Sequence, residues 1–202
     1  LRVTETSRSE LVRLMTGRDV ENVFPPRQPV SPDAPVVLDV EDLQLRGEFS
    51  KVSFQLRAGE ILGFAGLVGS KRSEILETIC GVRKPTSGRI SVNGKRLRPG
   101  SVPAAVKAGI GLSPEERKSQ GLILDEPLFK NVTLSTFERF ARAGYLNEKA
   151  ERDAARDQIT ALELRPADPD RPTRTLSGGN QQKILLARWV VHGTPVLLLD
   201  EP

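Results

Sequence analysis

The sequence is poor in cysteine and has no long hydrophobic run. Cys80 is the only cysteine among 202 residues, which excludes an intrachain disulfide framework and fits a reducing compartment. No apolar run approaches the roughly 18 residues that a membrane-spanning helix needs. The net charge of +4 arises from 30 Lys and Arg against 26 Asp and Glu. Because both signs are interspersed, we expect a mixed, solvated surface without a stripe for binding nucleic acid.

Proline concentrates near the start of the chain. Five prolines occur in this stretch, Pro25, Pro26, Pro29, Pro32 and Pro35. They predict a linker over residues 20–35, because proline removes backbone donors and disfavours regular structure. Before it, Ser7 and Glu10 form a capping box that predicts a short helix. A domain is expected to begin near Val36.

From Val36 onward, strand and helix patterns alternate, which predicts an α/β fold. Strands are expected at residues 36–40, 52–56, 60–65, 89–92 and 196–199. Helices are expected at residues 75–80, 147–164 and 177–191. The pair Asn93-Gly94 predicts a hairpin turn. The strand at 196–199 is a continuous apolar run, which predicts a central strand buried on both faces.

Residues 66–74, GLVGSKRSE, have the layout of a phosphate-binding loop but lack two of its residues. The regular pattern is G-x-x-x-x-G-K-[ST]. Gly66 is present and Ser73 supplies the hydroxyl, but Lys71 replaces the second glycine and Arg72 replaces the lysine. A strand, a glycine loop and a helix in succession direct backbone N–H groups at an anion. Taken alone, this loop also fits a glycine-rich turn without a ligand.

Two later motifs favour a phosphate ligand. LSGGNQQK, residues 176–183, places a hydroxyl and two glycines at a helix start, where bare N–H groups can approach phosphate. PVLLLDEP, residues 195–202, places Asp200 and Glu201 at the carboxyl end of a strand, where open α/β sheets bind ligands. There an aspartate can hold Mg²⁺ and a glutamate can polarise water. The structural alternatives are an ordinary N-cap at Ser177 and carboxylates that serve only solubility.

Together and in this order, the motifs of residues 36–202 resemble the nucleotide-binding domain of ATP-binding cassette (ABC) ATPases. GEILGFAGLVG (59–69), GIGLSPEERKSQGL (109–122) and LSGGNQQK resemble the second cassette of the tandem ATPases of bacterial sugar importers of the ribose, galactose and xylose type. The resemblance implies a P-loop NTPase (RecA-like) fold, a mostly parallel sheet flanked by helices. It adds an antiparallel β lobe and a helical signature subdomain at about 128–175. It also implies that residues 1–19 end a first ABC domain and that the chain is a segment cut after its Walker B strand.

In the family, the P-loop, Q-loop and Walker B strand of one cassette form a composite ATP site with the signature of another. By resemblance, the residues expected to bind nucleotide are Gly66, Leu67, Val68, Gly69, Ser70, Lys71, Arg72, Ser73 and Glu115. Ser73 and Asp200 are expected to hold Mg²⁺, and Glu201 is the expected catalytic carboxylate. The signature residues expected to contact the partner's nucleotide are Ser177, Gly178, Gly179 and Asn180.

Three residues depart from the general family pattern. Glu115 replaces the Q-loop glutamine and would repel phosphate unless Mg²⁺, Arg117 or Lys118 offsets its charge. Arg72 is usual in the second cassettes that this chain resembles, whereas Lys71 is not. If the backbone at Lys71 needs a positive φ, a side chain there costs about 1–2 kcal/mol. Its ammonium can add a charge-assisted hydrogen bond worth about 1.5–3 kcal/mol, so both outcomes stay open.

Three further residues or segments have weaker resemblances. Phe49 fits either the core or a stack on adenine, and we favour the core. Residues 122–127, LILDEP, nearly repeat the Walker B strand but precede the signature, so a structural or surface role is expected there. The family's switch histidine would follow Pro202, and His192 is therefore expected at a helix end.

The resemblance implies an ATP-binding and ATP-hydrolysing energy-coupling subunit of an ABC importer, for a monosaccharide, with ATP and Mg²⁺ as cofactors. The expected partners are transmembrane permease subunits, a periplasmic substrate-binding protein reached through them, and the first ABC domain, with no nucleic acid. The expected location is the cytoplasmic face of the inner membrane, as a peripheral protein. One alternative is a degenerate, non-hydrolytic cassette that donates LSGGN to its partner's site. Another is a soluble ABC ATPase of translation or DNA repair.

Overall fold

The structure is a computed structural model that describes residues 10, 14 and 29–201. The chain separates into two compact units, Leu1–Asp33 and Ala34–Pro202, and the second contains all the elements below. Of the helix predicted near Ser7 and the proposed first-domain tail at 1–19, only Glu10 and Leu14 are described, both as helical, and most of the predicted linker lies outside the described residues. Within the described residues, no helix has both the length and the apolar character that crossing a membrane requires.

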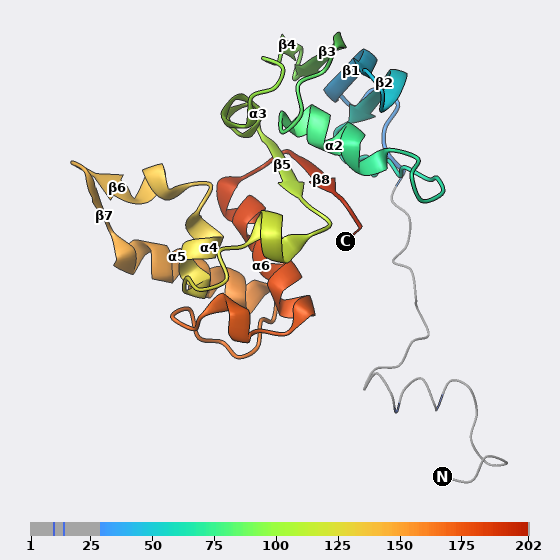
Figure 1. Ribbon diagram of the computed structural model, residues 1–202. Helices are drawn as coiled ribbons and strands as arrows, with labels where there is room; N and C mark the ends of the chain where they lie inside the picture. The colour runs from blue at the N-terminus through green and yellow to red at the C-terminus, as the bar shows by residue number, and fades with distance from the viewer. Residues whose placement is uncertain (1–9, 11–13, 15–28, 202) are drawn as a thin grey trace, which may run out of the picture. The chain divides into compact units, whose positions relative to one another are not determined.

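The second unit begins with a four-stranded antiparallel sheet (Figure 1). Its strands are β1 (Val36–Leu45), β2 (Phe49–Arg57), β3 (Ser87–Val92) and β4 (Lys95–Arg96), in the order β2-β1-β3-β4. Leu38 and Val40 alternate into the core, but the register shifts at Asp42 (φ 43°), and Leu43 is the next buried residue. A bulge therefore resets the inward face of β1.

Two helices and a parallel strand pair complete the first core. The helices are α2 (Arg72–Cys80) and α3 (Val102–Ala108), and both contact β5 (Ile110–Ser113). The strand β5 pairs in parallel with β8 (Val196–Leu199), which lies more than 80 residues later in the sequence. Gly81 ends α2 at φ 85°, and a Cβ there would approach the Ser101 backbone to 2.7 Å, so only glycine fits.

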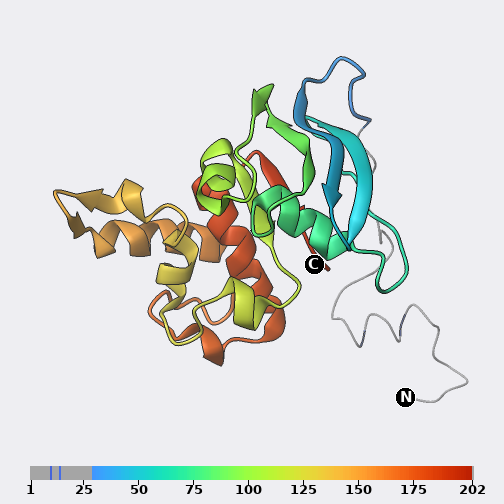
Figure 2. The ribbon, with the colours of Figure 1, turned by 45° about the horizontal axis from the view of Figure 1, so that its top comes forward.

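Three helices form a second, separate core (Figures 1 and 2). They are α4 (Leu128–Thr133), α5 (Glu148–Ala161) and α6 (Gly178–His192). The short helix η2 (Arg117–Gly121) precedes α4, and the shorter pieces between the three helices are η3 (Phe137–Phe140), β6 (Ala141–Arg142), β7 (Tyr145–Leu146) and η4 (Thr173–Thr175). As predicted, Asn147 caps α5 by accepting from the Ala150 N–H at 3.1 Å, and Ser177 caps α6. The helix α5 ends at Ala161, three residues earlier than predicted.

A buried carboxylate joins α4 to α5. Glu151 is 1% exposed, and it accepts hydrogen bonds from Thr133 Oγ1 at 2.7 Å and Lys130 Nζ at 3.2 Å. Lys130 Nζ also lies 3.2 Å from the Glu148 carboxylate. A buried charge is tolerated only when it is paired and hydrogen-bonded, so this cluster fixes how α5 packs on α4.

The predicted α/β class is confirmed, and so are the predicted helices and the hairpin at Asn93 (φ 48°) and Gly94 (φ 73°). The strand predicted at residues 60–65 is wrong, because this stretch is irregular. Ile61 is 98% exposed, and no described strand pairs with the stretch. Without a neighbour to satisfy its backbone groups, an apolar sequence gains nothing from the extended ladder.

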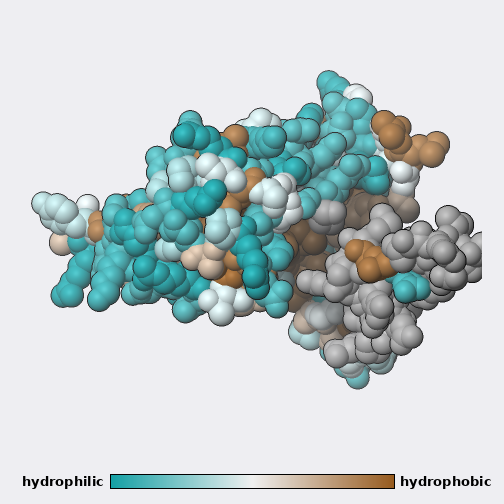
Figure 3. Space-filling model, turned by 90° about the horizontal axis from the view of Figure 1, so that it is seen from below, coloured by the Kyte–Doolittle hydropathy of each residue, from teal (hydrophilic) through white to brown (hydrophobic). Residues whose placement is uncertain are grey.

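The strand β8 differs from its prediction in burial. Val196 and Leu198 are buried, but Leu197 and Leu199 are 38% and 41% exposed. The prediction of burial on both faces is therefore wrong in this structure. Among the described residues, the first core covers the face of Val196 and Leu198, and nothing packs over the face of Leu197 and Leu199 to the same extent. Among the coloured residues, the surface seen in Figure 3 is mainly hydrophilic.

Candidate nucleotide-binding site

The start of α2 and the end of β8 meet, although 127 positions separate them. Ser73 Oγ donates to Asp200 Oδ1 at 3.1 Å. Asp200 is 8% exposed, and its N–H donates to the Ser113 carbonyl at 3.0 Å, which extends the β5–β8 pairing by one step. The sheet therefore carries Asp200 to the helix that presents Ser73, as the two motifs predicted.

Ser73 and Asp200 fit a magnesium site of the kind that shares its ion with phosphate. Their hydroxyl and carboxylate oxygens are the hard ligands that Mg²⁺ prefers, and Mg²⁺ commonly takes one or two protein ligands plus phosphate and water. Among the described residues, no cluster of three or more His, Cys, Asp or Glu side chains could hold a metal by itself. The donor set thus fits Mg²⁺ brought with a nucleotide rather than a self-sufficient protein cage.

Arg72 and Glu201 form an ion pair beside Ser73 and Asp200. The Arg72 Nη2 atom lies 3.3 Å from Glu201 Oε1, and the two side chains are 32% and 57% exposed. An arginine at this position can therefore serve as a counterion for the predicted catalytic carboxylate as well as a donor to phosphate. Since Glu201 is accessible, the pair is weak and can exchange partners.

Lys71 has the left-handed backbone that a glycine would favour. Its φ is 67°, and it precedes the first residue of α2. Its Nζ atom lies 2.6 Å from Glu48 Oε2 and 3.2 Å from Glu74 Oε1. Hydrogen bonds with Glu48 and then Glu74 raise the pKa of Lys71 above its ordinary value. The backbone at Lys71 therefore has the positive φ that the sequence left undecided, and the Lys71 ammonium pairs with two carboxylates.

The rest of the predicted phosphate loop is exposed. Gly66, Leu67, Val68, Gly69 and Ser70 precede α2, and Leu67 and Val68 are 87% and 100% exposed. The Ser70 N–H donates to the Leu67 carbonyl at 3.0 Å, with Gly69 at φ 86°. This turn directs the chain into the N-terminus of α2, where unpaired N–H groups and the helix dipole favour an anion.

Glu115 joins this cluster electrostatically. Repulsion from Glu201, together with some burial and repulsion from Asp200, raises the pKa of Glu115 above its ordinary value. Arg72 is the cation that opposes this shift. Of the cations that could offset Glu115, Arg117 lies against Gly178 instead. The predicted Q-loop residue thus reaches the site, but the charge that balances it comes from α2.

A cleft of about 700 Å³ opens beside this cluster. Arg72, Asp200 and Glu201 line one part of it, and apolar residues of β2, β8 and the irregular stretch 60–64 line most of the remainder. Phe49, the candidate for an adenine stack, instead packs against the first hydrophobic core, which confirms the core assignment.

The signature residues form a separate group at the start of α6. Asn180 Nδ2 donates to Ser177 Oγ at 3.1 Å and to the Arg165 carbonyl at 2.6 Å. A Cβ at Gly179 would have no neighbour within 4 Å, so the helix start is open there. No hydrogen bond or ion pair within residues 29–201 connects this group to Ser73, Asp200 or Glu201. The two groups are therefore distinct surfaces of one chain.

Two of the weaker predictions also have clear outcomes. Residues 122–127 form no strand, and Asp125 makes an exposed ion pair with Arg174, as expected for a surface segment. His192 ends α6, and its Nδ1 lies 2.8 Å from Thr194 Oγ1. Burial, with a contribution from Arg139, lowers the pKa of His192. Sequence reasoning missed Glu48, whose position in a surface turn gave no signal of its pairing with Lys71.

Comparison with known proteins agrees with this geometry. The family described as "ABC transporter" matches residues 49–202. The chain is 44% identical over 198 residues to the Ribose import ATP-binding protein RbsA of Corynebacterium glutamicum, covering 98% of this chain and 37% of that protein. It is 46% identical over 201 residues to the Ribose import ATP-binding protein RbsA 3 of Rhizobium etli, covering 100% of this chain and 39% of that protein. The chain thus spans less than half the length of these two relatives.

Solved structures support the fold. One is cbiO1 from Clostridium perfringens, part of the ABC transporter complex cbiONQ, with a TM-score of 0.65, 23% identity, and coverage of 83% of this chain and 66% of that one. Another is the ATP-binding cassette MJ0796 bound to ADP and Pi, with a TM-score of 0.65, 22% identity, and coverage of 82% and 74%. The sequence match, the fold and the meeting of Ser73 with Asp200 agree, and the chain belongs to the ABC transporter family as an ATP-binding cassette.

Proposed function

We propose that this chain is part of the ATP-binding, ATP-hydrolysing energy-coupling subunit of an ABC importer for a monosaccharide. The meeting of Ser73 with Asp200 at the start of α2 supports it most directly. The names of the two relatives, both ribose import ATP-binding proteins, support the importer assignment. No comparison names a translation or DNA repair factor among the relatives described above.

In this proposal, the loop of residues 66–73 and Arg72 bind the phosphates. Ser73 and Asp200 hold Mg²⁺, which neutralises phosphate charge when bound. Glu201 accepts a hydrogen bond from the water that attacks the terminal phosphate, provided that Arg72 exchanges Glu201 for phosphate. Ser177, Gly178, Gly179 and Asn180 receive the nucleotide of another ABC domain.

The proposed partners follow from the same role. They are transmembrane permease subunits, a periplasmic substrate-binding protein reached through them, and a first ABC domain to which residues 1–19 would belong. The subunit would lie at the cytoplasmic face of the inner membrane as a peripheral protein. The domain arrangement proposed above, with the linker at 20–35 and the cassette from residue 36, is part of this proposal.

A second candidate is a cassette that binds nucleotide without hydrolysing it and serves its partner's site. The ion pairs of Arg72 with Glu201 and of Lys71 with Glu48 favour it, because each pair engages charged side chains that hydrolysis at this loop would need to be free. Turnover of the full-length protein with Glu201→Gln separates the two candidates. A large loss of turnover supports hydrolysis here, and unchanged turnover supports the second candidate.

Nucleotide binding itself is tested by titrating the full-length protein with Mg-ATP. Arg72→Ala is expected to weaken binding at least about tenfold, because it removes a charge-assisted contact worth about 1.5–3 kcal/mol. Arg142→Ala, which removes the same charge from an exposed position on β6, is the matched control. Equal affinity in the wild type and both variants would contradict the role of Arg72.

A further inference from the structure

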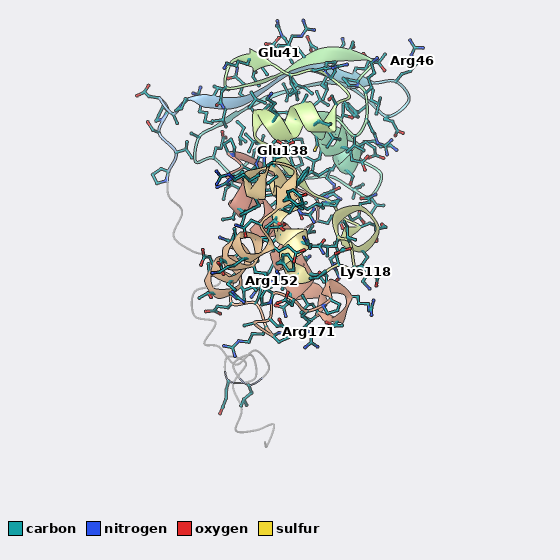
Figure 4. The ribbon with its side chains drawn as sticks, turned by 90° about the vertical axis from the view of Figure 1, so that its left-hand side faces the viewer. Glu41, Arg46, Lys118, Glu138, Arg152 and Arg171 are labelled. Atoms are coloured by element: carbon teal, nitrogen blue, oxygen red, sulfur yellow. The ribbon has the colours of Figure 1, made fainter. Side chains whose placement is uncertain are left out.

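A small cleft lies beside the start of α6, outside the cluster around Ser73 and Asp200. Its volume is about 270 Å³, and its lining includes Arg117 and Lys118 of η2, Arg174 of η4, and Gly178 and Gln181 of α6. Figure 4 labels Lys118 in the helical part, well away from Glu41 on β1 and Arg46 in the turn that follows it. The cleft therefore belongs to the helical part and adjoins the signature residues.

The cleft has an excess of positive charge. Three of the residues that line it are cationic, and none is acidic. Arg174 is paired with Asp125 at the surface. Within the part of the chain that the structure describes, neither Arg117 nor Lys118 forms an ion pair. Two uncompensated cations thus line one small cleft, which favours an anionic ligand there.

The Arg117 guanidinium lies directly against the start of α6. A Cβ placed on Gly178 would approach Arg117 Nη2 to 2.7 Å, so a side chain at residue 178 would displace the guanidinium. The Nε atom of Arg117 is buried and has no hydrogen-bond partner. A buried donor without a partner is costly, which indicates that a group absent from this chain completes the contact.

Gln181 provides an independent sign of an incomplete site. It is 3% exposed, and its Nε2 atom donates to the Thr173 and Leu176 carbonyls, at 3.3 Å each. These two bonds fix the orientation of the amide and direct Oε1 to the other side. The Oε1 atom is buried without a partner. It can accept one guanidinium N–H of Arg117, which would leave the remaining donors of that fork for a ligand.

Unpaired donors of α6 converge on the same place. The first N–H groups of a helix have no partner within the helix. The N–H of Asn180 is directed to Ser177 Oγ, at 3.5 Å, whereas Gly179 is unobstructed. Because a guanidinium binds two phosphate oxygens side by side, Arg117 and the N–H groups of Gly178 and Gly179 match one phosphate group.

We infer that Arg117 is a phosphate-contacting residue of the signature surface, which with the N–H groups of Gly178 and Gly179 binds the terminal phosphate of a nucleotide. The inference rests on the proposed function, in which this surface receives the nucleotide of another ABC domain. Lys118 adds charge to the cleft, and Gln181, whose buried Oε1 has no partner, lines it beside Arg117. The geometric requirement is local: glycine at residue 178 leaves room for the Arg117 guanidinium beside the phosphate.

The test measures phosphate binding residue by residue. The full-length protein that contains these 202 residues, labelled with ¹⁵N, is titrated with tripolyphosphate, ATP and inorganic phosphate while the amide signals of Gly178 and Gly179 are followed. Arg117→Ala is expected to weaken tripolyphosphate binding at these amides about tenfold, the loss of one charge-assisted contact. Arg117→Lys is expected to fall between it and the wild type, because it keeps the charge without the fork. Arg142→Ala is the matched control and is expected to bind as the wild type does.

Each outcome decides the inference. Equal affinity in the wild type and Arg117→Ala overturns it, and if Arg117→Ala disturbs signals throughout the chain, Arg117→Lys gives the same comparison. Tighter binding of inorganic phosphate than of ATP at Gly178 and Gly179 also overturns it, because the site would then take free phosphate. A response to ATP confined to residues 66–73 overturns the inference but leaves the proposed function standing. A response at Gly178 and Gly179 without one at residues 66–73 supports the inference and contradicts nucleotide binding by this chain's own loop.

Discussion

Replacing Glu115 by glutamine is expected to strengthen Mg-ATP binding at the loop of residues 66–73. Glu115, Asp200 and Glu201 place three carboxylates around Arg72, and their mutual repulsion raises the pKa of Glu115. A nucleotide brings further negative charge to this cluster, and Mg²⁺ offsets only part of it. Glu115→Gln removes one repelling charge and preserves the size and most of the hydrogen-bonding capacity of the side chain.

The size of the effect follows from Coulomb's law. Glu115 is exposed, so the effective dielectric constant lies near the high end of the range for protein surfaces. Between an exposed carboxylate and a phosphate, solvent screens most of this repulsion. Its removal is therefore expected to tighten binding only about threefold, the size typical of one exposed charge pair.

The assay is a Mg-ATP titration of the full-length protein as a function of pH. At pH values well above the raised pKa of Glu115, its carboxyl is ionised and the variant is expected to bind more tightly than the wild type. As the pH falls through the raised pKa of Glu115, the wild-type carboxyl becomes neutral and the difference disappears. Protonation of ATP itself affects both proteins alike, so their affinity ratio isolates Glu115.

Glu138→Gln is the matched control, because it removes the same charge from an exposed side chain of η3 (labelled in Figure 4). It is expected to leave the affinity unchanged. Weaker binding by Glu115→Gln, or a gain that persists at low pH, would refute the reasoning. Weaker binding would mean that the Glu115 carboxylate itself assists the nucleotide, for example by orienting Mg²⁺-bound water.

Two further predictions concern the cores. Lys130→Met leaves the buried Glu151 carboxylate without its cation. This substitution is expected to lower the free energy of unfolding, measured in urea, by about 2–3 kcal/mol. The loss of a fully buried pair costs about 3–5 kcal/mol, and the effect here is smaller because Lys130 is partly exposed. The exposed Lys149→Met on α5 is its control, and equal stability of both variants would show that Thr133 alone holds Glu151. Burial raises the pKa of the Cys80 thiol to about 11, so a thiol reagent at pH 8 is expected to label folded Cys80 about 100-fold more slowly than unfolded Cys80; equal rates would indicate that α2 opens locally.

Local sequence patterns were sufficient to predict the helix ends and turns whose hydrogen bonds are made within a few residues. Gly81 ends α2, Asn147 begins α5 and Ser177 begins α6 through bonds to residues only a few positions away. The Asn93-Gly94 turn adopts positive φ at both residues, as its hairpin requires. Such features depend on neighbours in the sequence, and that is why they could be predicted from it.

The candidate site could be predicted in identity but not in its pairings. The motifs indicated Ser73 and Asp200 as a couple, because each motif carries its own chemistry at a fixed point of a strand or helix. The partners of the charged residues, in contrast, could not be predicted from the motifs. Lys71 is directed to Glu48, and Arg117 lies against Gly178 instead of balancing Glu115. The sequence does not reveal these choices, because long charged side chains reach any of several neighbours.

The sequence alone determined the α/β class, the family resemblance and the residues proposed to carry the phosphate chemistry, because propensity, caps and motif spacing are local properties. Tertiary structure decided that residues 60–65 form no strand, because a strand depends on a neighbour to bond its backbone. It likewise decided that Leu197 and Leu199 of β8 stay partly exposed, because burial of a strand face depends on what packs over it. It also decided which carboxylate each cation meets, since residues 127 positions apart, such as Ser73 and Asp200, become neighbours only when β5 and β8 pair.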